Sequence, residues 1–166
     1  MTDRIRVVVV GAGQAGLAVS RELTQAGVTH VVFEKGKVGQ TWRGRWDSFC
    51  LVTPNWSVQL PGRPYDREEP DGFMVRDDVV AYLEGYATGF KAPVQEGIEV
   101  VSPQPGRDGG FLLETSSGQI RARTVVLSTG AYQRPHRPAG AATLPTELLQ
   151  IDAEDYRNPA DLPPGP

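Results

Sequence analysis

The chain has 166 residues, a formal net charge of −3 and one cysteine. A chain of this length fits one domain and can bury a core large enough to fold by itself. Acidic and basic residues are interspersed with no basic stripe, which argues against nucleic acid or an anionic membrane as a partner. The single cysteine, Cys50, excludes an internal disulfide and a cysteine cluster that could hold zinc or an iron–sulfur centre.

The amino-terminal region contains no long apolar run. Its first run, Val7 to Val10, is too short for a signal-peptide core or a membrane span. We therefore expect a soluble, cytoplasmic protein with no membrane partner. The only histidines, His30 and His136, are far apart in the sequence, so we predict neither a metal site nor a Cys–His nucleophile pair. The catalytic residues stay unassigned, and the chemistry is expected to come from a bound cofactor.

The first 34 residues have the pattern of a βαβ unit. Ile5 to Val10 is β-branched except at Arg6, which predicts a buried parallel strand. Gln14 to Ala26 is predicted to be a helix that ends at Gly27. Val31 to Glu34 is predicted to be a second buried strand, so the order is strand, glycine turn, helix, strand.

The remainder is more irregular. Lys35 to Gly72 has no clear period and is rich in Gly, Pro, Trp and Arg, which is typical of a functional loop region. Arg76 to Gly89 is predicted to be a helix, because Asp77 and Asp78 suit its first turn and apolar residues follow at helical spacing.

The second half of the chain predicts a β-meander. Ile98 to Val101 is expected to be a strand, and Phe111 to Thr115 with Gln119 to Arg123 a hairpin. Thr124 to Ser128 is expected to be a further strand. The fold class is therefore α/β, with a Rossmann-like parallel sheet and a meander inserted into it.

A glycine turn joins the first predicted strand to the first helix. Gly11, Gly13 and Gly16 form G-x-G-x-x-G, in which the first glycine allows the tight turn, the second lets a diphosphate approach, and the third lets helix and strand pack closely. The diphosphate would lie at the helix N-terminus. Glu34 ends the second strand, where its carboxylate would accept hydrogen bonds from a ribose diol and repel a 2′-phosphate. This pattern favours FAD or NAD over NADP; the alternative is a turn without ligand and a surface glutamate.

The segment after the second strand distinguishes FAD from NAD as the expected cofactor. Gly39-Gln40-Thr41-Trp42-Arg43 follows Glu34, and much later Val125 to Gly130 reads V-V-L-S-T-G. At these residues the sequence resembles the flavin-containing monooxygenase family and its bacterial relatives, in which G-G-x-W-R lies along the flavin. Gln40 replaces the second glycine of that motif.

The resemblance implies an FAD site. In it Val100 would contact the adenine through its backbone, and Thr53 would approach the flavin ring. For Trp42 the alternative is a packing aromatic, for Arg43 a solvated charge, and for Thr129-Gly130 a plain strand-end turn. The residues predicted to line the FAD are Gly11, Gly13, Gln14, Ala15, Gly16, Glu34, Lys35, Gly39, Gln40, Thr41, Trp42, Arg43, Thr53, Val100, Thr129 and Gly130.

The chain departs from the family pattern in two places. The family has an F-x-G-x-x-x-H fingerprint with a tyrosine four residues after the histidine. Here Asp152 and Tyr156 have that spacing, so aspartate replaces the histidine, while Thr146 and Leu148 replace Phe and Gly. In some members a catalytic asparagine directly follows V-T, whereas here Pro54 intervenes, so Asn55 is not assigned.

The resemblance also implies how the chain is divided. Residues 1–157 would form the N-terminal part of an FAD-binding domain, incomplete relative to the family. Residues 158–166 are proline-rich and would form a linker to an NADPH-binding domain that this sequence does not contain. In the complete relative NADPH would reduce FAD, and the flavin would oxygenate a small nitrogen-, sulfur- or carbonyl-containing substrate. We therefore expect no NADPH-dependent oxygenation by this chain alone, and possible self-association through an unfinished face.

Three other functions remain open. The chain could belong to another flavoprotein oxidoreductase, such as a disulfide reductase, although it lacks a C-x-x-C pair. It could be a non-catalytic FAD-binding module. It could also be a small NAD-binding Rossmann protein, which would have no use for a segment placed along a flavin.

Overall fold

The computed structural model describes residues 4–106, 109–131 and 135–164. A six-stranded sheet has the order β3-β2-β1-β6-β5-β4, in which β3, β2, β1 and β6 are parallel and β6, β5 and β4 form an antiparallel meander. Among these residues no helix has both the length and the apolar character needed to cross a bilayer. The elements are β1 (Ile5–Val10), α1 (Gln14–Gln25), β2 (His30–Glu34), α2 (Gln40–Arg43), α3 (Arg76–Gly89), β3 (Val94–Glu96), β4 (Val100–Pro105), β5 (Phe111–Thr115) and β6 (Gly118–Leu127), with 3-10 turns at Asn55–Ser57, Ala139–Thr143 and Pro159–Asp161.

β1 is the centre of the sheet, as its β-branched run predicts. Val8 pairs with Val31 of β2 on one side and with Val125 of β6 on the other. Because side chains alternate along a strand, Val7 and Val9 join the core cluster under the helices, while Val8 joins a second cluster on the opposite face. The two clusters explain why Val7 to Val10 are all apolar, while Arg6, near the start of the strand, is exposed.

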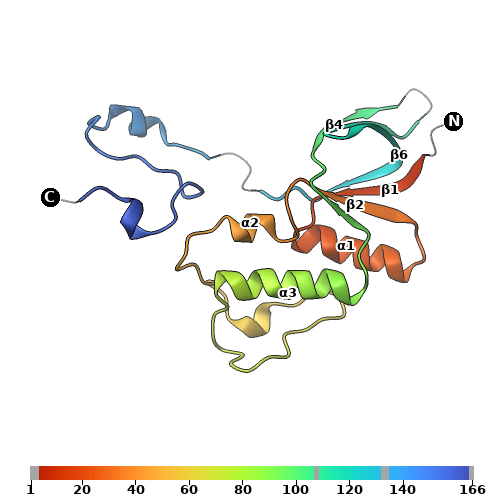
Figure 1. Cartoon of the computed structure of the whole chain (residues 1–166), viewed down its shortest axis with the longest axis horizontal. Coiled ribbons are helices and arrows are strands. Elements are labelled where there is room, and N and C mark those ends of the chain that lie inside the picture. The colour runs from red at the N-terminus through yellow and green to blue at the C-terminus, as the bar shows by residue number, and fades with distance from the viewer. Residues whose placement is uncertain (1–3, 107–108, 132–134, 165–166) are drawn as a thin grey trace.

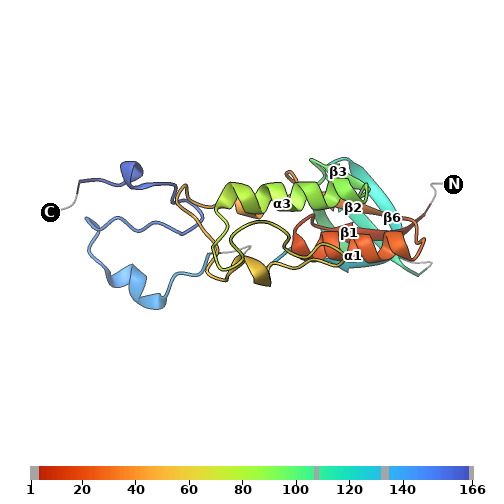
Figure 2. The ribbon, with the colours of Figure 1, turned by 90° about the horizontal axis from the view of Figure 1, so that it is seen from below.

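The helices cover one face of the sheet. Figure 1 shows α1 and α3 lying on the same side of the parallel strands, and Figure 2 shows them from below. Leu17 of α1 and Leu83 of α3 are fully buried in the same cluster. The bounds predicted for α3 are confirmed, and its apolar stripe is buried as expected at Val79, Val80, Leu83 and Tyr86.

The meander covers the other face and differs from its prediction. The two strands expected over Gln119 to Arg123 and Thr124 to Ser128 are one continuous strand, β6. No turn residue separates the two halves, so the backbone stays extended. The first half pairs with β5 and the second with β1, and Ala122 pairs with both.

Three further elements differ from the sequence pattern. β3 was not predicted, because a three-residue strand that follows Pro93 has no detectable period. β4 begins at Val100, not at Ile98, since the N–H of Ile98 donates to the backbone carbonyl of Glu34 (3.0 Å). α2 is a single turn of helix inside the stretch that has no period.

The carboxyl-terminal segment, residues 135–164, contains only 3-10 turns and lies beside the far end of α2 (Figure 1). It contacts the turn that follows α2. The N–H of Asp47 donates to the Arg157 carbonyl (2.9 Å), and the Asn158 amide donates to Asp47 Oδ2 (3.0 Å). The predicted linker thus begins at a residue that is hydrogen-bonded to the rest of the molecule. The domain boundary at residue 157 stays a prediction.

Candidate dinucleotide-binding site

The glycine turn joins β1 to α1 and contacts the end of β6. Gly11 has a φ of +102°, a conformation that L side chains rarely adopt, and a Cβ placed there would lie 2.5 Å from the Ser128 carbonyl oxygen. A Cβ on Gly16 would lie 1.9 Å from the Gly11 carbonyl oxygen. These two glycines are therefore required by the protein's own packing.

Gly13 has a different environment. Its φ of −84° and ψ of −168° are accessible to any residue, and a Cβ placed on it would meet no atom of the described chain within 4 Å. The fold itself therefore does not require a glycine at this position. Its missing side chain leaves open space directly before the first turn of α1, which is where a diphosphate needs to approach.

The N-terminus of α1 presents its first amides to this space. Gly13 is the N-cap residue and carries no side chain, so it cannot cap the helix with a side-chain oxygen. Gln14 and Ala15, the first helical residues, are exposed. Since the first N–H groups of a helix have no partner within it and carry the positive end of its dipole, this end of α1 suits an anion.

Glu34 holds the turn from the neighbouring strand. Its side chain is 8% exposed; Oε2 accepts from the Ala12 N–H (2.8 Å) and Oε1 from the Gly36 N–H (2.9 Å). The sequence predicts a ribose ligand here, and the structure adds that the same carboxylate braces the backbone of the glycine turn. Each carboxylate oxygen has a further lone pair, so the group keeps the capacity to accept from ribose hydroxyls.

Three strand ends meet at this point. The N–H of Ser128 donates to the Val10 carbonyl (2.8 Å), which places the exposed residues Thr129 and Gly130 next to the glycine turn. The chain leaves β1 towards β2 on one side, and β6 lies on the other. Such a reversal of strand order leaves a crevice outside the carboxyl ends of the strands, where ligands of open α/β sheets bind.

The segment predicted to lie along a flavin forms α2. Its N-cap, Gly39, is left-handed with a φ of 74°, and its N–H points to the Ala12 carbonyl at 3.5 Å. Gln40 and Thr41 are exposed. The structure therefore brings the predicted segment beside the glycine turn.

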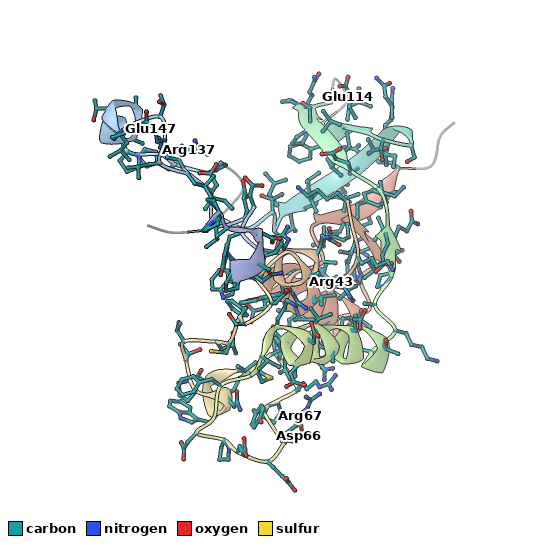
Figure 3. All side chains as sticks on the ribbon, turned by 60° about the vertical axis from the view of Figure 1, so that its left-hand side comes forward. Arg43, Asp66, Arg67, Glu114, Arg137 and Glu147 are labelled. Carbon is teal, nitrogen blue, oxygen red and sulfur yellow. The ribbon has the colours of Figure 1, made fainter. Side chains whose placement is uncertain are left out.

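Trp42 and Arg43 are held by the protein itself. Trp42 packs against the core cluster, with its ring 5.6 Å from that of Phe49. Arg43 donates from Nε to the Val38 carbonyl (3.3 Å) and forms an ion pair with Glu84 of α3. Figure 3 shows Arg43 directly above α3. The packing alternative is supported for Trp42, and Arg43 is an anchor between α2 and α3, not a freely solvated charge.

The remaining predicted residues are less tightly grouped. Lys35 is exposed next to Glu34, and Thr53 is exposed on the loop before the turn at Asn55–Ser57. Val100 begins β4, where it pairs with Thr115, and the segment just before it contacts the Glu34 backbone. Contact with FAD stays a prediction for these three positions, as it does for the other predicted site residues.

Two polar residues that the sequence leaves without a role are structural. Asn55 is 5% exposed; its Nδ2 donates to the Glu69 carbonyl (2.9 Å), and its Oδ1 accepts from the Met74 N–H (2.6 Å). Its side chain therefore holds the loop between Glu69 and Met74 in place. Asp152 accepts two hydrogen bonds from Arg137, at 2.8 and 2.9 Å, and this contact lowers the pKa of its carboxyl.

The glycine turn, the acidic strand end and the switch of strand order define a Rossmann-like dinucleotide-binding fold. The profile of the pyridine nucleotide-disulphide oxidoreductase family matches residues 8–158, so the chain belongs to this family.

Individual relatives agree with this family. A CzcO-like oxidoreductase of Geobacillus kaustophilus is 36% identical, and the match covers 99% of this chain and 47% of that protein. The indole-3-pyruvate monooxygenase YUCCA4 of Oryza sativa is 31% identical, covering 91% of this chain and 38% of that protein. The chain thus spans less than half the length of these curated relatives.

Solved structures extend the comparison. A flavin-containing monooxygenase from Stenotrophomonas maltophilia has a TM-score of 0.72 and 27% identity, covering 82% of this chain and 42% of that one. An S-allyl-L-cysteine S-oxygenase from Allium sativum has a TM-score of 0.79 at 23% identity, covering 95% and 44%, which is a likeness of fold. The resemblance to the amino-terminal part of flavin monooxygenases and their bacterial relatives is confirmed. The chain therefore belongs to a family of flavin-dependent oxidoreductases and monooxygenases.

Proposed function

We propose that this chain binds FAD at the carboxyl ends of β1, β2 and β6, beside the glycine turn and Glu34. The open position at Gly13 carries the proposal. Backbone atoms occupy the space where a side chain of Gly11 or Gly16 would lie, whereas the space beside Gly13 is empty. A glycine there gains nothing for the fold and leaves room for a diphosphate.

Different residues of the site would bind different parts of FAD. The diphosphate lies at the N-terminus of α1, against the amides of Gln14 and Ala15. Glu34 accepts from the adenosine ribose, and the exposed start of α2 at Thr41 faces the flavin end. When bound, FAD would supply hydride and oxygen chemistry, and the chain would bind and orient it.

We further propose that the complete protein is an NADPH-dependent flavin monooxygenase of a small nitrogen-, sulfur- or carbonyl-containing substrate. Support comes from the relatives that are named as monooxygenases, among them the Stenotrophomonas and Oryza proteins. The substrate itself stays undefined, since the residues that would contact it are not assigned. The test is NADPH oxidation by the full-length protein, followed by detection of an oxygenated product in a panel of amines, sulfides and ketones.

Another flavoprotein oxidoreductase is the second candidate. The family includes disulphide oxidoreductases by name, and the one cysteine of this chain, Cys50, is exposed. A thiol–disulfide mechanism within this chain would need a second cysteine, which the sequence does not contain. We therefore rank this candidate below the monooxygenase.

The direct test of the cofactor is a titration of the purified chain with FAD and, separately, with NAD. FAD binding is followed by visible absorbance and by flavin fluorescence, and NAD binding by calorimetry. We expect FAD to bind more tightly than NAD. Tighter binding of NAD would replace the flavoprotein assignment with that of a small NAD-binding protein. Light scattering on the same sample reports self-association, for which exposed Leu127 and Val101 are candidate contacts.

A further inference from the structure

We propose that Gln40 is a positioning residue for the ribose-binding carboxylate of Glu34, and that it acts through Gly36. This inference rests on the proposed function, since it concerns how the adenosine half of a dinucleotide is recognised. Gln40 stands where the motif that the chain resembles has a second glycine, and a glycine could not make the side-chain contacts described below.

The side chain of Gln40 folds back over the loop that precedes α2. Its Oε1 accepts a hydrogen bond from the Lys37 N–H (3.2 Å), while its own backbone N–H donates to the Lys37 carbonyl (2.9 Å). These two bonds close the turn from residue 37 to residue 40 in both directions, much as a capping box closes the start of a longer helix.

The same side chain lies directly on Gly36. A Cβ placed on Gly36 would meet the Cγ, Oε1 and Cδ atoms of Gln40 at 2.6, 2.7 and 2.8 Å. Gly36 is not among the residues with a positive φ, so its backbone conformation does not require a glycine. A Cβ at this position would instead displace the exposed Gln40 side chain from the space that it occupies.

Gly36 is also the residue that orients Glu34. Its N–H donates to Glu34 Oε1 (2.9 Å), while the Ala12 N–H holds Oε2 (2.8 Å). The Gly36 carbonyl in turn accepts from the Gly97 N–H (3.2 Å), which ties the loop to the end of β3. Gln40 therefore lies against one of the two residues that hold the carboxylate, and each carboxylate oxygen keeps a lone pair that can accept from a ribose hydroxyl.

Gln40 and Gly36 should therefore act together in the recognition of the ribose. Removing the Gln40 side chain loosens the turn at Gly36. Adding a methyl group to Gly36 expels the Gln40 carboxamide from the same place. Both changes should weaken the recognition of a ribose hydroxyl, and once one has been made the other should have little left to remove.

The experiment compares ADP with 2′-deoxy-ADP, two probes that share the adenine and the diphosphate and differ in one ribose hydroxyl. Calorimetric titrations are made with the wild-type chain, Gln40→Ala, Gly36→Ala and the double variant. We expect the wild type to prefer ADP, and each single variant to reduce that preference by about three- to tenfold, as for the loss of one oriented hydrogen bond. The double variant should lose no more than either single variant. FAD affinity should fall in parallel, while the thermal midpoint of the free chain stays unchanged.

Gln40→Glu is the conservative control. It keeps an oxygen that can accept from Lys37, so it should keep the preference for ADP, although its added negative charge lowers the affinity for both nucleotides. If Gln40 had a merely structural role, Gln40→Ala would instead change the two affinities equally and leave their ratio intact.

The possible failures can be told apart. If the wild-type chain binds neither ADP nor FAD, the proposed function is wrong. If it binds both but does not discriminate against 2′-deoxy-ADP, or if Gln40→Ala retains the full preference, the positioning role is overturned. Strictly additive losses in the double variant would also overturn it, because they would show that Gly36 and Gln40 act independently.

Discussion

The two ends of the described chain are held by different forces. In the amino-terminal unit, β1, α1 and β2 bury their apolar residues on both faces of the sheet. In residues 135–164 five large apolar side chains stay exposed, namely Leu144, Leu148, Leu149, Ile151 and Leu162. That segment is attached by polar contacts, such as the bond from Asn158 to Asp47.

This difference indicates how each region responds to change. Apolar burial stabilises by roughly 25 cal/mol per Å² and does not depend on charge state, so the amino-terminal unit should tolerate changes of pH and salt. Exposed ion pairs and hydrogen bonds contribute little each and are screened by salt. The carboxyl-terminal segment should therefore detach while the sheet remains folded.

The largest expected effect is at Gly16. In Gly16→Val the new Cβ would lie 1.9 Å from the Gly11 carbonyl oxygen, which is backbone and cannot move without breaking the turn. We expect a loss of at least about 3 kcal/mol in the free energy of unfolding, measured by urea denaturation. A variant with wild-type stability would show that α1 does not pack this closely against β1.

The next effect separates the two regions directly. Leu83→Ala empties a fully buried position on α3 and should cost about 2–5 kcal/mol of unfolding free energy. Its matched control, Leu149→Ala, removes the same side chain at a position that is 56% exposed and should change stability by less than about 0.5 kcal/mol. Equal costs would contradict the proposed contrast between the regions.

Gly13→Val tests the site without disturbing the fold. The backbone there accepts any residue and a Cβ meets no atom within 4 Å, so the free energy of unfolding should fall by only about 1 kcal/mol or less, the cost of an aliphatic N-cap residue. The valine would occupy the position of the diphosphate, and FAD affinity should fall by roughly 100-fold or more, measured by absorbance titration. Together with Gly16→Val it distinguishes a glycine needed for binding from one needed for folding. Unchanged affinity would place the cofactor elsewhere.

The smallest expected effect is at Asp47. Its carboxylate accepts from Asn158 and is paired with Arg76 (3.0 Å), and these contacts lower the pKa of Asp47 below its usual range. Because the pKa in the folded state is lowered, the attachment is present at neutral pH and is lost as the pH falls through that lowered value. The protection of residues 149–158 against hydrogen exchange, taken relative to the intrinsic exchange rate at each pH, should therefore fall in acid before the sheet unfolds.

Substitutions check the same attachment at neutral pH. Asp47→Asn keeps the shape of the side chain and removes its charge, so it should speed exchange in residues 149–158 and leave the overall unfolding transition unchanged. Leu149→Ala serves as a neighbouring control that does not touch the Asp47 contacts. If residues 149–158 exchanged at the same rate in Asp47→Asn as in Leu149→Ala, Asp47 would not be what attaches the segment.

Local patterns predict the amino-terminal half of this protein well. The spacing of Gly11, Gly13 and Gly16 between a β-branched run and a helix predicts the turn, and Glu34 follows at the distance that a βαβ unit requires. The helix at Arg76–Gly89 is equally legible, because acidic residues begin it and apolar residues recur at helical spacing. These features depend on neighbours in the sequence, so they can be predicted without knowing the fold.

The tertiary structure alone decided which residues from distant parts of the chain meet. It joined two expected strands into β6 because that strand has a different partner on each half, and it attached Asn158 to Asp47 across 111 positions. It also distinguished Gly13, which has open space beside it, from Gly11 and Gly16, which do not, and it placed the Gln40 side chain against Gly36. No periodicity reports such contacts, because they arise from packing between elements and not from the order of residues within one.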